Sequence, residues 1–138
     1  IHDRFVAGVT EELKGLVVDD ALKPGTQIGP VVDQKQLDQD MRYIEIGRGE
    51  GANLAWGGER LNRETPGFYL QPALFTDTGN TMRINREEIF GPVATVIAVD
   101  GDRVTTLGGN EPPNGISVNS YRLSKVRGIV GYGSPRRG

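Results

Sequence analysis

A nearly all-apolar run from Val93 to Val99, mostly of β-branched residues, places the strongest constraint on how this chain can fold. β-Branched residues favour strands, and a strand that is apolar at successive positions is covered on both faces. Helices do that covering in α/β proteins. The run therefore predicts a buried strand of a mostly parallel sheet flanked by helices. A loop at the mouth of such a strand, here Glu87 to Pro92, is a common place for ligand contacts.

Two amphipathic helices are expected ahead of this strand. In the first segment, the apolar residues with the spacing of one helix face are Phe5, Val6, Val9, Leu13, Leu16 and Val17. The second helix should begin after Asp33, an N-cap residue with Gln36 three positions further on. Its apolar stripe is Leu37, Met41 and Ile44, and Gly47 is expected to end it.

Shorter apolar segments lie between and after these elements. Leu54 to Trp56 predicts a short strand. Phe68 to Phe75 is aromatic and extended, but Pro72 cannot donate to a ladder, so this segment should be an edge strand or a strand that breaks midway. Later, residues 104–107 suggest a helical turn and residues 116–118 a strand. The alternation of helices and strands indicates the α/β class.

A glycine-rich segment, Gly47 to Ala52, matches the dinucleotide pattern G-x-G-x-x-A. That motif works when a strand precedes it and a helix follows, so that the helix N-terminus meets a pyrophosphate. Here the expected order is reversed. We therefore interpret the segment as a helix-to-strand connection without a role in cofactor binding.

Composition removes several classes of function. The 138 residues contain no cysteine and one histidine, His2, which leaves no thiolate chemistry and little basis for a catalytic triad or a metal site. A net charge of −2 gives no reason to expect nucleic acid or an anionic membrane as partner. No apolar run approaches the ~20 residues that span a bilayer, and no secretory leader is visible. We expect a cytoplasmic protein.

Residue chemistry alone leaves two interpretations of the Glu87–Pro92 loop. Glu87 and Glu88 could be a solvated acidic pair, with Phe90 a core aromatic residue, or the loop could contact a ligand. The loop and the β-branched run behind it also resemble the signature of the NAD(P)-dependent aldehyde dehydrogenases. Further segments that resemble the family's motifs are residues 29–32, 67–75 and 110–117.

The resemblance covers residues 1–117 and is greatest to bacterial semialdehyde dehydrogenases, such as those for 2-oxoglutaric semialdehyde. It implies a partial catalytic domain from the C-terminal part of the enzyme, followed by a divergent or shortened tail, residues 118–138. In that family a cysteine thiolate attacks the aldehyde and hydride passes to NAD or NADP. Glu88 matches the glutamate that binds the nicotinamide ribose, and Phe90 matches an aromatic residue beside the cofactor. The resemblance assigns no catalytic residue to this chain.

Two hypotheses of function follow. In the first, the chain is a fragment, a partly resolved chain or a degenerate copy of an enzyme that oxidises an aldehyde. We then expect it to be inactive alone, because the nucleophile and the dinucleotide domain are absent. Alternatively, it is a non-catalytic α/β module derived from that fold and acts in subunit association. Because family members assemble through this half, we expect a homo-oligomer in both cases.

Overall fold

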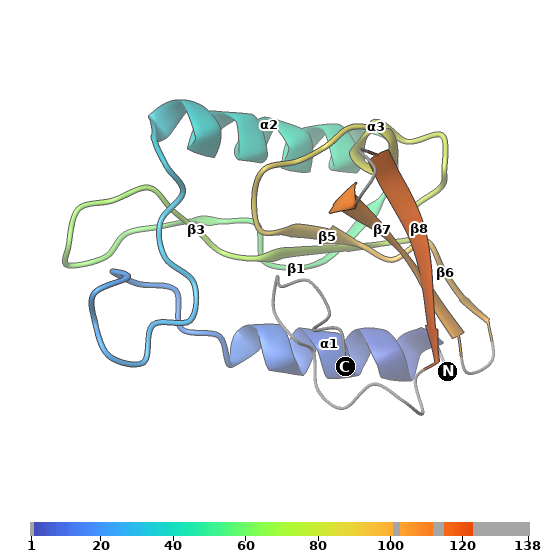
Figure 1. The fold of residues 1–138 in the computed structure, drawn as a ribbon, viewed down its shortest axis with the longest axis horizontal. Coiled ribbons are helices and arrows are strands. Elements are labelled where there is room, and N and C mark those ends of the chain that lie inside the picture. Colours follow the sequence, from blue (N-terminus) through green and yellow to red (C-terminus); the bar gives the residue numbers. More distant parts are fainter. Residues whose placement is uncertain (1, 101–102, 112–114, 123–138) are drawn as a thin grey trace.

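Helices cover both faces of a small central sheet (Figure 1). The computed structural model describes residues 2–100, 103–111 and 115–122, with the backbone alone from residue 98 on. Helix α1 (His2–Lys14) lies on one face, and α2 (Gln34–Gly49) lies on the other. The short helix α3 (Arg83–Arg86) lies beside one end of α2. This layered arrangement confirms the expected α/β class.

The strands of the described residues form three small sheets. Their order is β1-β4-β5 in the central sheet, β2-β3 in the second and β6-β7-β8 in the third. The eight strands are β1 (Asn53–Trp56), β2 (Arg60–Leu61), β3 (Tyr69–Leu70), β4 (Ala73–Thr76), β5 (Val93–Thr95), β6 (Ala98–Asp100), β7 (Arg103–Glu111) and β8 (Gly115–Arg122).

Strands β1 to β4 form one irregular antiparallel ribbon. Strand β1 pairs with β4, and β2 pairs with β3. Between the two pairs, the Gly58 amide donates to the Gln71 carbonyl at 3.2 Å, and the Gln71 amide donates to the Glu59 carbonyl at 2.8 Å. Gly57 has φ +72°, and a Cβ there would lie 1.7 Å from the Pro72 carbonyl oxygen, so glycine is required. The predicted break of the 68–75 segment at Pro72 is confirmed.

The central sheet is mixed rather than mostly parallel. Strand β4 pairs antiparallel with β1 and parallel with β5. The antiparallel pair arises because the ribbon turns back on itself. All four residues of β4 are buried, and Phe75 is 0% exposed. The core around it contains Leu37, Ile44, Ala52, Leu70, Ala73, Phe75 and Ile84.

The prediction of one strand from Val93 to Val99, buried on both faces, is wrong. The run is divided into β5 and β6, and only Val96 between them is buried among residues 93–97. Within the described residues β5 pairs with β4 alone, and Ala94 is exposed. The reason is that β5 lies at the edge of its sheet, while β4 occupies the central, doubly covered place that the sequence suggested for this run.

Helix α2 begins as expected and ends later than expected. The Asp33 side chain accepts a hydrogen bond from the Gln36 amide at 2.7 Å, which confirms the N-cap. Gly47 does not end the helix. A Cβ on Gly47 would lie 3.0 Å from two ring atoms of Phe75 and 3.1 Å from Ile84, so this glycine allows close packing of α2 on the core.

The true end of α2 is a Schellman motif. The Ala52 amide donates to the Gly47 carbonyl at 3.0 Å, and the Gly51 amide donates to the Arg48 carbonyl at 3.1 Å. Gly51 has φ +89°, a conformation in which glycine carries no steric penalty. Because α2 precedes this turn and β1 follows it, the segment from Gly47 to Ala52 is the helix-to-strand connection that was predicted.

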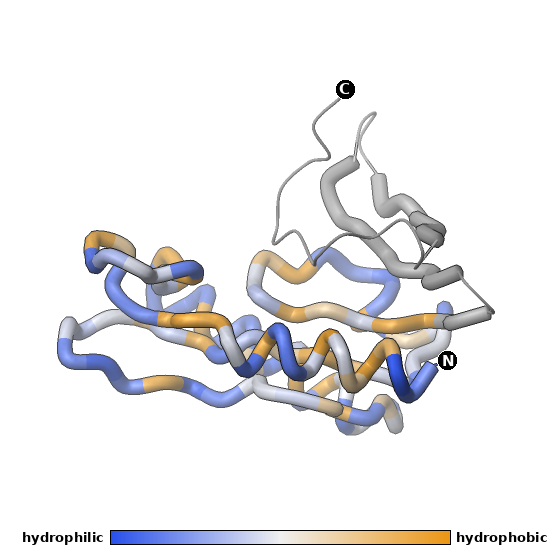
Figure 2. Tube along the Cα trace, turned by 90° about the horizontal axis from the view of Figure 1, so that it is seen from below, coloured by the Kyte–Doolittle hydropathy of each residue, from blue (hydrophilic) through white to orange (hydrophobic). Residues whose placement is uncertain are grey.

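Helix α1 packs only partly on the sheet. Its apolar face (Phe5, Val6, Val9 and Leu13) is half-buried, and none of its residues is fully buried. In Figure 2 apolar and polar residues alternate along this helix. The helix ends at Lys14, before the expected Leu16 and Val17. The Lys14 ammonium nitrogen lies 5.3 Å from the centroid of the Trp56 ring on β1, within the range of a cation–π contact.

In the third sheet, one sequence prediction fails and one is confirmed. Residues 104–107 belong to β7 and form no helical turn, because backbone pairing with β6 and β8 outweighs local preference. Residues 116–118 lie in β8, as expected. The proposed boundary after residue 117 falls inside β8, and residues 123–138 lie outside the described residues. The division into 1–117 and 118–138 therefore stays a prediction.

Candidate functional site

The loop from Glu87 to Pro92 connects α3 to β5 and is held at both ends by backbone hydrogen bonds (Figure 1). At its start, the Glu87 amide donates to the Arg83 carbonyl at 2.9 Å. At its end, the Pro92 carbonyl accepts from the Ala73 amide of β4 at 2.8 Å. A loop with both ends fixed on a helix and a central strand presents its side chains in a defined position.

Glu87 fastens this loop to two helices. Its carboxylate accepts two hydrogen bonds from the Arg83 guanidinium, at 2.8 and 2.9 Å, and one from the Tyr43 hydroxyl of α2 at 2.9 Å. Arg83 first, and then Tyr43, lower the pKa of Glu87 from 4.5 to about 2. Sequence pattern assigned Glu87 no role beyond membership of an acidic pair, whereas in the structure it anchors the loop.

Glu88 and Phe90 point into open surroundings on the same loop. Both are exposed, and Phe90 is 65% exposed. The alternative that Phe90 is a core aromatic residue is therefore wrong. The Glu88 carboxylate makes no side-chain hydrogen bond or ion pair with the part of the chain that the structure describes. Both residues are thus free to contact a ligand, and their assignment to a cofactor stays a prediction.

Behind the loop, Gly91 rests on a buried carboxyl group. Asp40 of α2 is 0% exposed, and a Cβ on Gly91 would lie 2.3 Å from its Oδ2 atom. The Oδ1 atom accepts a hydrogen bond from Gln36 Nε2 at 2.8 Å, while Oδ2 has no partner. Burial raises the pKa of Asp40, and the Gln36 hydrogen bond opposes that rise.

Sequence reasoning missed Asp40, although a signal was present. The residue lies three positions after Leu37 and four before Ile44, which places it on the buried stripe of α2. An acidic residue at such a position must either find partners or lose its charge. The spacing could therefore have singled out this group.

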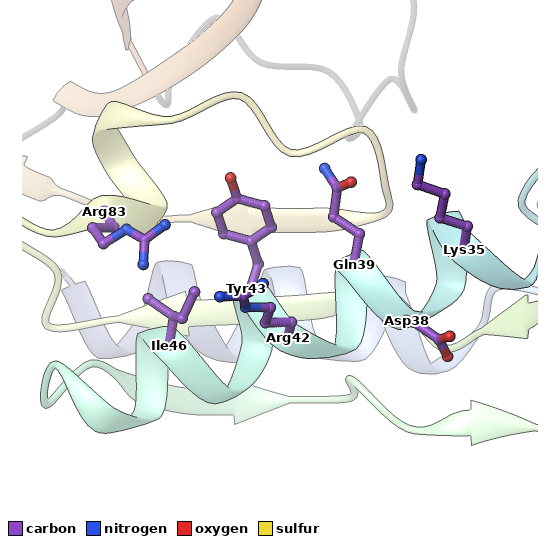
Figure 3. Close-up of a pocket in the computed structure, with 7 residues that line it drawn as sticks. All are labelled: Lys35, Asp38, Gln39, Arg42, Tyr43, Ile46 and Arg83. Carbon is purple, nitrogen blue, oxygen red and sulfur yellow. The ribbon is translucent and has the colours of Figure 1, made fainter.

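An open groove of about 460 Å³ lies along α2 on the side of the same loop (Figure 3). Its lining residues are Lys35, Asp38, Gln39, Arg42, Tyr43, Ile46 and Arg83. Figure 3 shows the side chains of Lys35, Gln39 and Tyr43 on the loop side of the helix and the Asp38 carboxylate pointing away. Lys35 and Arg42 give this surface a positive character that favours anions.

This groove was also not foreseen from sequence. Lys35, Gln39 and Arg42 follow one another at i, i+4 and i+7, so they share one face of α2. That spacing was the available signal, but it is common on solvated helices. What distinguishes these residues is the loop beside them, which only the tertiary structure brings there.

Two other classes of site find no support in the described residues. Residues 2–100, 103–111 and 115–122 contain no group of three or more His, Cys, Asp or Glu side chains that could hold a metal ion. In the same ranges no helix has the length and apolar character needed to cross a membrane.

Comparison with known proteins identifies the family. The pattern of the aldehyde dehydrogenase family matches residues 1–110. The betaine aldehyde dehydrogenase of Mesorhizobium japonicum is 40% identical over 123 residues, which are 88% of this chain and 25% of that protein. The alpha-ketoglutaric semialdehyde dehydrogenase of Bacillus subtilis is 37% identical over the same shares. This chain belongs to the aldehyde dehydrogenase family, as its motifs predicted.

Solved structures agree with this assignment. A Mycobacterium tuberculosis aldehyde dehydrogenase complexed with NAD+ superposes with a TM-score of 0.68 at 42% identity, over 72% of this chain and 21% of that one. An NAD+ complex of an aldehyde dehydrogenase from Bacillus cereus gives a TM-score of 0.66 at 35% identity, over 72% and 20%. The chain spans about a quarter of the length of the curated relatives that it matches.

Proposed function

We propose that this chain carries one side of the nicotinamide-ribose subsite of an NAD(P)-dependent aldehyde dehydrogenase, an enzyme that oxidises an aldehyde to the carboxylic acid. The observation that carries the proposal is the anchored loop that exposes Glu88 and Phe90 beside the α2 groove. The NAD+ complexes among the family's solved structures support a nicotinamide cofactor. They leave the choice between NAD and NADP open to measurement.

The loop suits a ribose ligand chemically. An ionised carboxylate such as Glu88 can accept a hydrogen bond from each hydroxyl of a vicinal diol. The exposed ring of Phe90 offers an apolar surface two residues further on, against which a flat ring could pack. NAD(P)+ would supply the hydride acceptor, and the residues of this chain would bind and orient it. The positive groove would favour the phosphate side of the same ligand.

The proposed substrate is a small aldehyde, with betaine aldehyde and alpha-ketoglutaric semialdehyde as the first candidates because relatives act on them by name. The 138 residues contain no cysteine, so the chain by itself should form no NADH from any aldehyde. Absorbance at the NADH band, recorded with purified chain and both aldehydes, tests this. Turnover above the background of a heat-denatured sample would contradict the inactive-fragment proposal.

The subsite itself can be tested in a graft. Residues 1–110 would replace the matching quarter of the Bacillus subtilis alpha-ketoglutaric semialdehyde dehydrogenase, and KM for NAD+ and NADP+ would be measured. In the graft we expect Glu88→Gln to raise KM for the preferred cofactor at least about tenfold, since a hydrogen bond to a charged group contributes ~1.5–3 kcal/mol. Phe90→Ala should also raise KM, because the apolar ring contact with the cofactor is lost. Glu64→Gln, at an exposed glutamate outside the loop and the groove, is the control. Unchanged KM in both site variants would exclude the proposed subsite.

A second function, subunit association without catalysis, is favoured by the edge of β5, which has no second partner strand among the described residues, and by exposed apolar residues. Leu22 is 92% exposed and Val32 is 83% exposed. Unpaired strand edges and exposed apolar side chains promote self-association. Light scattering of the purified chain tests association: an oligomer that dissociates in Leu22→Ser and Val32→Ser variants supports it, and a monomer excludes it. The proposed complete enzyme is a cytoplasmic homo-oligomer.

A further inference from the structure

Asp40 is the one carboxyl among the described residues that lies fully buried with an oxygen atom lacking a partner. Its Oδ2 atom lies directly under Gly91, so close that a single Cβ on that residue would overlap all three atoms of the carboxyl group. Gln36 supplies one hydrogen bond, to Oδ1. The fit between Asp40 and Gly91 therefore depends on whether this carboxyl group carries a charge.

An ionised carboxylate in this position is costly. Removing a carboxylate from water costs several kcal/mol unless partners replace its hydration, and one neutral amide replaces only part of it. Two states avoid the cost. Either the carboxyl keeps its proton, or the turn at Gly91 moves off and lets water reach Oδ2.

Among the described residues, no neighbouring cation stabilises the ionised form of Asp40 in the closed loop. On its own helix, the Asp40 carboxyl meets the neutral amide of Gln36, and the nearby cations Lys35 and Arg42 face the groove. On the loop, Glu87 is occupied by Arg83 and Tyr43, and Glu88 is exposed. Burial and the Gln36 amide are the causes that act on the pKa of Asp40.

We propose that Asp40 is a pH-sensitive positioning residue of the cofactor loop: the neutral carboxyl lets Gly91 close onto α2, and the ionised carboxylate opens the turn that carries Glu88 and Phe90. The consequence for cofactor binding rests on the proposed function, while the movement of the loop does not. Because the closed loop favours the protonated acid, closure is fully present below the ordinary pKa near 3.8. It weakens as pH rises above that value, by up to tenfold for each pH unit, until the pKa of the closed state is passed.

Hydrogen–deuterium exchange without cofactor tests the movement directly. The protection factor of the Val93 amide, which donates to the Gly91 carbonyl at 2.8 Å, would be followed from about pH 4 to pH 8, corrected for intrinsic exchange. In the unmodified chain we expect the protection factor to fall at least tenfold within a single pH transition, the step referred to below. In Asp40→Asn the step should vanish, because that side chain cannot ionise. Protection in the core strand β4 should stay unchanged in both.

Asp38→Asn is the matched control, since it removes the same charge two residues away from a side chain that is exposed. It should keep the step. If circular dichroism shows that the Asp40→Asn variant does not fold, the Gln36→Leu variant is measured in its place. Loss of the Gln36 hydrogen bond further disfavours the charged form, so the step should move to higher pH. A flat profile in the unmodified chain, a step retained in Asp40→Asn, or an unmoved step in Gln36→Leu would overturn the proposal.

The result is separable from the subsite test. Suppose that the loop opens with pH, but the Glu88 and Phe90 variants leave KM unchanged in the graft. This result would support the proposed role of Asp40 and reject the cofactor role of the loop. A loop that shows no pH step while the same variants raise KM would reject the proposed role of Asp40 and support the cofactor role. The two experiments therefore fail independently.

Discussion

Glu87 illustrates how one side chain fixes the candidate site. Sequence pattern treated Glu87 and Glu88 as a pair, but the structure gives them different roles. Glu87 is bound by Arg83 and Tyr43, and Glu88 is left exposed on the loop. The difference follows from the turn after α3, which directs the first carboxylate back toward α2 and the second outward.

The Glu87 anchor predicts a pH dependence of stability. Because its pKa is lowered from 4.5 to about 2, Glu87 contributes stability above pH 4.5, and this contribution is lost as pH falls through about 2. The free energy of unfolding, measured with denaturant, should therefore be lower for Glu87→Gln than for the unmodified chain at neutral pH. The two values should converge in acid. Glu88→Gln, which removes a carboxylate that has no partner among the described residues, should follow the unmodified chain throughout. If the two free energies of unfolding differed by the same amount at every pH, the anchoring role of Glu87 would be contradicted.

At the scale of elements, α2 carries both the core and the site. Its buried stripe includes Leu37, Ile44 and Gly47, while its opposite side supplies Lys35 and Arg42 to the groove. One rigid helix therefore determines where the loop sits relative to the groove. Its N-cap was predictable because Asp33 acts locally, whereas the packing role of Gly47 was not, because Phe75 comes from a strand far along the chain.

Gly47 and Gly49 make a matched pair on α2. In Gly47→Ala the new methyl group would press on Phe75 and Ile84, so the free energy of unfolding should fall by about 1–3 kcal/mol. In Gly49→Ala the new Cβ has no atom within 4 Å, and the gain in helix propensity should raise the free energy of unfolding by up to about 1 kcal/mol. Urea unfolding monitored by circular dichroism measures both. Equal effects of the two changes would show that the contact with Phe75 does not limit packing.

At the scale of the whole molecule, the two helices that flank the sheet differ in how firmly they are held. Helix α2 buries four residues, and α1 buries none. We expect α1 to open locally at lower free energy, with amide protection factors at least about tenfold below those of α2. Hydrogen exchange with mass spectrometry reads both helices in one sample. Equal protection would mean that α1 unfolds only with the whole chain.

Sequence by itself determined the family, the α/β class, the N-cap of α2, the break at Pro72 and the loop that carries Glu88 and Phe90. These features depend on motifs or on interactions between residues close in the chain. Tertiary structure decided which strand is central, why Gly47 must be small, what Glu87 binds and how Asp40 lies beneath Gly91. Each of these depends on partners distant in sequence, because burial and strand pairing are properties of the assembled layers. The apolar run from Val93 to Val99 pointed correctly to a sheet, but only the fold placed β4 at its centre and β5 at its edge.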